Sequence, residues 1–134
     1  MATLSYRCTE DNGLSFELLV DGQPLGALVG SRDTAFPYWI VEDGVPRYPP
    51  HGTADDPDAR IVCVCNCGEY GCGHTGCRVT RQGDEVVFNE FDFDVSREGA
   101  RMVFRFAVAN YQSVCKEIGE LARQQRERDI AGRR

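Results

Sequence analysis

The chemistry that this sequence offers is concentrated in one cysteine- and glycine-rich segment, residues 63–77 (CVCNCGEYGCGHTGC). Five cysteines and one histidine fall within these fifteen residues. Thiolates are the preferred ligands of tetrahedral zinc, and glycines allow a backbone to fold closely around an ion. The segment therefore predicts a structural metal site, with zinc as the expected ion.

Spacing narrows the choice of ligands. Residues two apart on a strand are separated by ~6.6 Å, whereas sulfurs bound to one zinc lie ~3.8 Å apart. We expect Cys65 and Cys67 to converge where the strand ends, and Cys72 to return across the glycine turn. Cys77 or His74 would then complete a set of four ligands.

Two other uses of the cysteines compete with metal binding. Buried thiols often pack as small apolar groups, and thiolates near a histidine can act as nucleophiles or redox centres. The C-x-x-C motif typical of redox proteins is absent from the sequence. His74 is only two residues from Cys72, so a tight turn would not align the pair for catalysis.

Size and charge restrict the class of protein. The chain has 134 residues, which suits one domain; we expect it to span residues 1–125, with 126–134 as a flexible tail. A net charge of −6 argues against nucleic-acid binding. Apolar runs are far shorter than the ~20 residues of a membrane helix. Seven cysteines, an odd number, suit a reducing compartment, so we expect a cytoplasmic protein.

Hydrophobic periodicity predicts an α+β fold. Apolar stretches at residues 15–20 and 25–29 flank an Asp21-Gly22 turn and predict an N-terminal hairpin. A proline-rich loop, residues 30–59, follows. We then expect an antiparallel β-meander of four strands and one C-terminal helix packed on the sheet, because an apolar stripe with helical spacing begins at Tyr111. The stripe consists of Tyr111, Val114, Cys115, Ile118, Leu121 and Ala122.

Acidic residues cluster late in the meander. Residues 85–89 form the third predicted strand, and a bulge near Asn89-Glu90 would let it continue through residues 91–95. Alternation with apolar neighbours then predicts that Glu90, Asp92 and Asp94 share the solvent face of a rigid strand. Such a surface favours binding to a basic protein partner.

The region around the turn resembles a known family. Residues 64–72 (VCNCGEYGC), the following Arg78-Val79 and residues 86–91 (VVFNEF) resemble small uncharacterised bacterial proteins with a C-x-C-G-x-x-G-C turn. Residues 104–106 leading to Tyr111 are similar to the closing strand-to-helix step of that family. The resemblance covers roughly the second half of the chain and implies no activity or cofactor.

The resemblance also bears on the ligand set. It implies that Cys65, Cys67 and Cys72 form the central trio, whereas Cys63, Cys77 and His74 lie outside the shared motif.

These observations favour a non-enzymatic accessory or protein-binding protein. One concrete form is an acidic inhibitor or immunity protein that neutralises a basic partner, with the cysteine turn as a structural metal site. The alternative is a thiol- or metal-dependent enzyme, or a redox sensor, that uses the same cysteines. The sequence contains no phosphate-binding loop or nucleophile elbow that would name a reaction.

Overall fold

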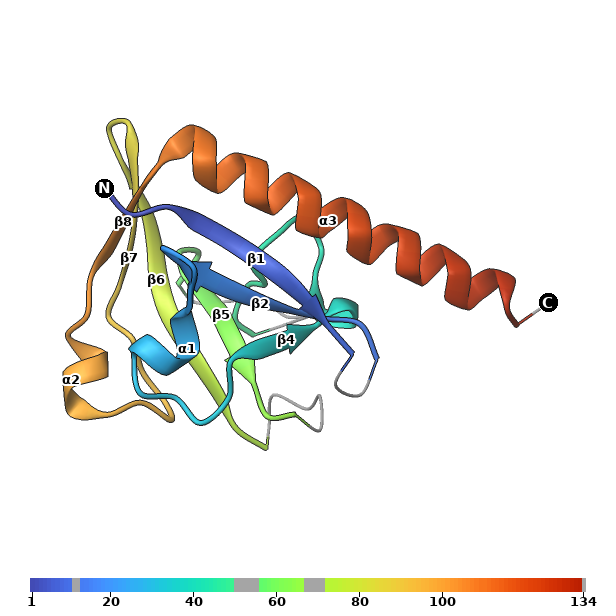
Figure 1. Ribbon diagram of the computed structural model, residues 1–134, viewed down its shortest axis with the longest axis horizontal. Coiled ribbons are helices and arrows are strands. Elements are labelled where there is room, and N and C mark those ends of the chain that lie inside the picture. Colours follow the sequence, from blue (N-terminus) through green and yellow to red (C-terminus); the bar gives the residue numbers. More distant parts are fainter. Residues whose placement is uncertain (11–12, 50–55, 67–71, 134) are drawn as a thin grey trace.

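The computed structural model describes residues 1–10, 13–49, 56–66 and 72–133. Two antiparallel sheets pack against each other, and the C-terminal helix lies across them (Figure 1). The predicted fold class, an α+β meander with an N-terminal hairpin and one covering helix, is confirmed. The first sheet contains β1 (Leu4–Thr9), β2 (Ser15–Val20), β3 (Gln23–Pro24) and β4 (Ala35–Pro37), with β2 paired to the other three.

The second sheet carries the cysteine-rich region. Its strands follow chain order and pair with their neighbours. The hairpin predicted around residues 82–84 is confirmed, with Gln82 opposite Glu85. The strands are β5 (Ala59–Val64), β6 (His74–Gln82), β7 (Glu85–Asn89) and β8 (Phe104–Ala107).

Within the described residues, short helical turns connect some of the strands: α1 (Leu25–Leu28), η1 (Tyr38–Ile40) and α2 (Arg97–Ala100). The prediction of a strand over residues 25–29 was wrong. The two-residue strand β3 ends at Pro24, because proline has no N–H to continue a ladder. The chain then closes one helical turn, in which the N–H of Val29 donates to the carbonyl of Leu25 at 3.1 Å.

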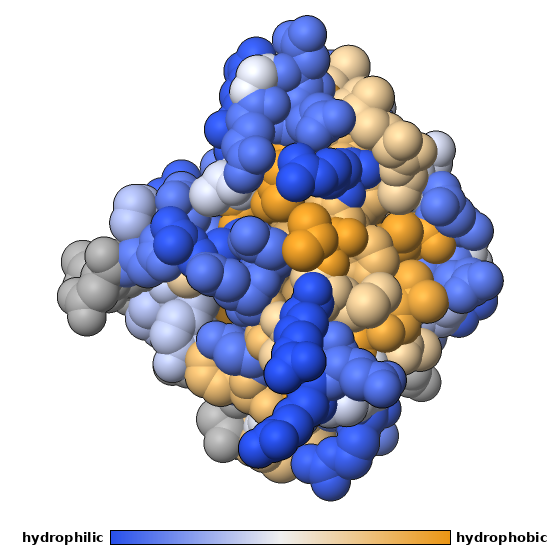
Figure 2. Space-filling model, turned by 90° about the vertical axis from the view of Figure 1, so that its left-hand side faces the viewer, coloured by the Kyte–Doolittle hydropathy of each residue, from blue (hydrophilic) through white to orange (hydrophobic). Residues whose placement is uncertain are grey.

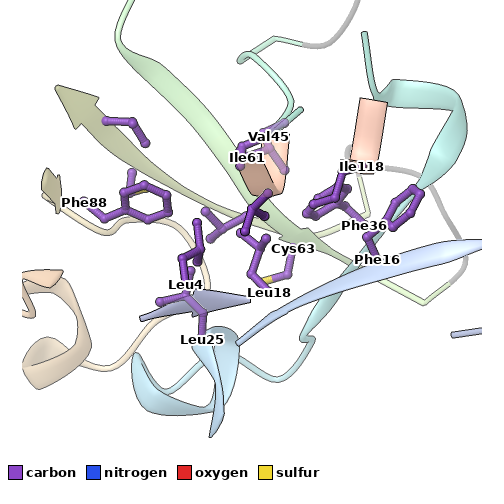
Figure 3. Packing of buried hydrophobic residues seen from close by; sticks show 14 of the residues in the cluster. Leu4, Phe16, Leu18, Leu25, Phe36, Val45, Ile61, Cys63, Phe88 and Ile118 are labelled. Carbon is purple, nitrogen blue, oxygen red and sulfur yellow. The ribbon is translucent and has the colours of Figure 1, made fainter. Parts of the chain in front are cut away.

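The core lies between the two sheets and beneath the helix. Apolar side chains from β2 and β4 meet those from the second sheet, and Figure 3 shows Cys63 among them. Phe16, Leu18, Phe36 and Ile61 are fully buried. Because Cys63 is equally buried, this thiol serves as a small apolar group in the core.

The helix α3 (Val108–Ala131) begins directly after β8. Its buried residues, Val114, Ile118 and Ala122, belong to the predicted apolar stripe. The helix continues through Ala131, so most of residues 126–134, which the sequence predicts to be a flexible tail, is helical. The Tyr38 hydroxyl donates to Asp129, and Arg126 donates to the Tyr38 carbonyl at 3.3 Å, so the last turns are tied to η1.

One face of the molecule carries apolar surface. Figure 2 shows a continuous apolar area on the side where the N-terminus, β8 and α2 lie in Figure 1. Met1, at the N-terminus, is 80% exposed, and Val103, just before β8, is 50% exposed. Among the helices that the structure describes, none is long and apolar enough to cross a membrane.

Candidate functional site

The β5–β6 hairpin brings two of the predicted ligands together. Val64 and His74 form the last register pair, and beyond them the N–H of Cys65 donates to the carbonyl of Gly73 at 2.8 Å. This bond draws the two strand ends inward, so the sulfur atoms of Cys65 and Cys72 lie 3.3 Å apart.

The sulfur separation is suited to two kinds of chemistry. A disulfide requires ~2.05 Å, and two thiolates on one zinc lie ~3.8 Å apart. The observed 3.3 Å lies between these values, so a small side-chain movement would reach either state. Arg32 and Asp33 line the shallow cavity of about 300 Å³ beside the two sulfurs.

Of the predicted ligands that the structure describes, Cys77 and His74 do not join this pair in a metal-binding group. Cys67 lies outside the described residues. Cys77 is buried on β6, and burial raises the pKa of its thiol well above the usual value. Within the described parts of the chain, no group of three or more cysteine, histidine or acidic side chains is arranged to hold a metal ion.

His74 belongs to an aromatic cluster. Its ring stacks on the ring of Tyr48, with centroids 5.3 Å apart. It also packs against the ring of Phe93, with centroids 4.1 Å apart. The ring centroids of Tyr48 and Phe93 are 5.5 Å apart, so these two rings also pack together. The imidazole therefore packs against two aromatic rings from the loops before β5 and after β7.

Cys63, the first cysteine of the 63–77 segment, faces the core. Its thiol donates weakly to the Ser31 hydroxyl at 3.5 Å, and burial raises its pKa. A neutral thiol packed among apolar groups is typical of a structural cysteine and not of a metal ligand.

The acidic residues 90–94 do not form a strand, so that prediction was wrong. β7 ends at Asn89, and Glu90 and Phe93 adopt left-handed backbone conformations with φ of 54° and 68°. The predicted break at Asn89-Glu90 therefore occurs, but regular pairing does not resume. The segment instead follows β6 loosely, with the N–H of Asp92 donating to the carbonyl of Gly76 at 3.0 Å.

Because the backbone is irregular here, the carboxylates of Glu90, Asp92 and Asp94 point in different directions. Glu90 pairs with Arg78, whereas Asp94 approaches Arg32 at 3.8 Å, beside the cysteine pair. Asp92 lies over Gly76: a Cβ on that glycine would be 3.0 Å from the Asp92 Oδ1 atom and from the Phe93 ring. Only Glu90 and Asp92 therefore share a surface.

That surface includes two further carboxylates that sequence reasoning did not assign to it. Asp56 and Asp58, which precede β5, lie 3.4 and 3.2 Å from the Arg78 guanidinium. Glu90 lies 3.5 Å from the same group. These carboxylates raise the pKa of Arg78, chiefly through the hydrogen bond with Asp58. We call the group Asp56, Asp58, Glu90 and Asp92 the acidic face.

A cavity of about 560 Å³ opens within the acidic face. Its lining combines carboxylates with an aromatic wall, and it also includes the buried residues Gly76 and Cys77. Proximity along the sequence does not predict this arrangement, because the lining comes from four separated segments. The lining includes Tyr48, Asp56, Arg60, Arg78, Asp92 and Phe93.

The carboxyl group of Asp92 has a raised pKa. Asp92 is an exposed residue, yet the protein atoms around its carboxyl group displace enough water to raise the pKa above 3.8. A hydrogen bond from the Gly76 N–H and the nearby His74 act in the opposite direction.

Comparison with known proteins finds no family model, curated protein or solved structure that matches this chain.

Proposed function

We propose that the chain is a non-enzymatic, cytoplasmic binding protein that engages a basic protein partner through the acidic face, in the manner of an inhibitor or immunity protein. The observation that carries this proposal is that the carboxylates of Asp56, Glu90 and Asp92 line one cavity, with Asp58 next to them on Arg78. Among the described residues that line the cavity, the cationic groups are the guanidinium groups of Arg60 and Arg78. The surface therefore has a surplus of negative charge, which attracts and orients a basic protein.

Rigidity also supports the proposal. Arg78 fixes Asp56, Asp58 and Glu90 by ion pairs, and the Asp92 backbone is bonded to β6. Charges that are already held in place lose little conformational entropy when a partner binds. Asp94, which the sequence grouped with them, is directed toward Arg32 instead and has no part in this proposal.

The cysteine end of the β5–β6 hairpin has a structural role in this proposal. Cys65 and Cys72 would supply two thiolates to a zinc ion, and Cys67 would be the third sulfur ligand. The ion would lock the irregular end of the hairpin, since a structural metal contributes its binding free energy to folding.

The test is affinity capture from the source cell, followed by measurements on the purified partner. The double variant Glu90→Lys and Asp92→Lys should lose the basic partner. The control, Glu98→Lys and Glu120→Lys, makes the same charge change at exposed sites outside the cavity lining and should retain it. The association rate with the wild-type chain should fall as salt rises, because steering is screened over ~10 Å at 0.1 M. Equal loss in both variants, or a salt-independent rate, would contradict the proposal.

The sulfur contact favours one alternative, a thiol-dependent enzyme or redox sensor. In that case Cys65 and Cys72 would cycle between dithiol and disulfide, for which their 3.3 Å separation is favourable. A small-molecule turnover that disappears in Cys72→Ser, with no protein partner recovered, would decide for this alternative.

A further inference from the structure

The cavity in the acidic face has the features of a site for an organic cation. Its volume of about 560 Å³ falls within the range of sites that enclose a ligand group, roughly 300–1,000 Å³. Asp56, Glu90 and Asp92 line it together with the rings of Tyr48 and Phe93. Carboxylates attract positive charge, and the faces of aromatic rings do so through their quadrupole.

Asp92 is the carboxylate that remains for a ligand. Asp56 and Glu90 already face the Arg78 guanidinium, and the Arg60 guanidinium donates to the backbone carbonyls of Pro57 and Ala59 at 2.6 and 3.0 Å. Among the described residues, neither arginine forms an ion pair with Asp92. The charge of Asp92 is therefore the one that an incoming cation would neutralise.

Phe93 adds a flat apolar surface next to that charge. The residue is 48% exposed although it is aromatic, and its left-handed backbone holds the ring against Gly76. A guanidinium group can stack on an aromatic ring while its edge donates two hydrogen bonds to a carboxylate, whereas an ammonium group acts as a point charge. The pairing of Asp92 with Phe93 therefore favours arginine over lysine.

We propose that this cavity receives the guanidinium side chain of an arginine on the basic partner, with Asp92 as its carboxylate contact and Phe93 as its stacking surface. This inference rests on the proposed function and identifies its anchor. Gly76 is part of the site because a side chain there would push Asp92 and Phe93 out of the cavity wall.

The experiment titrates the full chain with the capped tripeptide acetyl-Gly-Arg-Gly-amide and follows backbone amide resonances by NMR. Saturable shifts should centre on Gly76, Asp92 and Phe93. The citrulline counterpart has the same shape without charge and should not bind. The lysine counterpart should bind more weakly than the arginine peptide.

Variants separate this site from a general charge effect. Asp92→Asn should weaken binding of the arginine peptide about tenfold, as expected for loss of one charged hydrogen-bond partner. Phe93→Leu should also weaken it, whereas Asp94→Asn, two residues away and outside the cavity lining, should not. Unchanged resonances elsewhere in each variant show that the fold is retained.

Several outcomes would overturn the inference: equal binding of the citrulline peptide, wild-type affinity in Asp92→Asn, or shifts outside the cavity. Free L-arginine binding as tightly as the peptide would assign the cavity to a small molecule instead. If the arginine peptide fails while the captured partner still requires Glu90 and Asp92, the inference is wrong and the proposed function stands.

Discussion

The sulfur atoms of Cys65 and Cys72 lie 3.3 Å apart although six residues separate them in the chain. The backbone bond between the Cys65 N–H and the Gly73 carbonyl produces this approach, because it fixes the register of the hairpin end. The pair is therefore positioned by β-sheet geometry and not by a local C-x-x-C turn. Its chemistry can be tested independently of the acidic face.

The first prediction concerns metal content. Protein purified under mild reducing conditions without a chelator should carry about one zinc ion per chain, as expected for a single structural site. Cys72→Ser should lose the ion and unfold at a lower temperature, since the metal contributes to folding. Elemental analysis with thermal denaturation is the measurement. Negligible metal in the wild-type protein, or a sulfur-sulfur bond found by mass spectrometry in reducing buffer, would contradict the prediction.

Cys115 provides the matched control for that experiment. It lies on α3 against Gly44, partly buried, and burial raises the pKa of its thiol. Cys115→Ser should destabilise the fold by about 1 kcal/mol, because a hydroxyl group is harder to bury than a thiol. Its metal content should equal that of the wild-type protein. Loss of the ion in this variant would mean that α3 supplies a ligand.

The packing of α2 against Val29, the residue that follows α1, gives a prediction about the fold. A Cβ on Gly99 would lie 1.6 Å from the Val29 carbonyl oxygen, and neither backbone can move without disrupting its turn. Gly99→Ala should therefore destabilise the protein by at least about 3 kcal/mol, the upper part of the range for overpacking. Denaturant unfolding measures the effect.

Gly119 is the counterpart that should respond in the opposite direction. It lies inside α3, and an added Cβ would make only ordinary contacts, the nearest at 3.5 Å to Asp43. Gly119→Ala should stabilise the protein by about 0.5–1 kcal/mol, because alanine loses less backbone entropy in a helix. Destabilisation in this variant would show that α3 packs more tightly on residues 43–44 than the structure indicates.

Local patterns predicted the regular elements well and the site poorly. The β6–β7 hairpin and the stripe of α3 follow from periodicity within a few residues, and both were predicted. The strand β1 was missed, although Leu4, Tyr6 and Cys8 alternate with polar residues. That signal is short, and two of its three residues are not fully buried.

The failure at residues 91–95 has a clear physical cause. Phe91, Phe93 and Val95 alternate as a strand would, but Glu90 and Phe93 adopt left-handed conformations that non-glycine residues seldom take. Tertiary contacts with β6 determine those conformations, and no local propensity indicates them. The cavity could not be predicted for the same reason, because its lining depends on where separated loops meet.

The last prediction concerns the pH dependence of stability at Asp92. Its pKa is raised in the folded state, mainly because the carboxyl group is desolvated. The protonated carboxyl therefore contributes stability that is fully present below the unfolded pKa of about 3.9 and is lost as pH rises through the folded pKa. The titratable groups near it are His74, Cys77, Arg60, Arg78, Asp56 and Glu90.

Asp92→Asn removes this titration and keeps an oxygen that can accept the hydrogen bond from Gly76. The free energy of unfolding of the variant, relative to wild type, should therefore increase as pH rises above about 4, because only the wild-type protein must then hold a desolvated charge. Urea unfolding at several pH values from 3 to 7 measures the difference, and Asp94→Asn reports the effect of removing a carboxylate from the same segment. A pH-independent difference, or one that falls with rising pH, would mean that the folded protein stabilises the ionised Asp92.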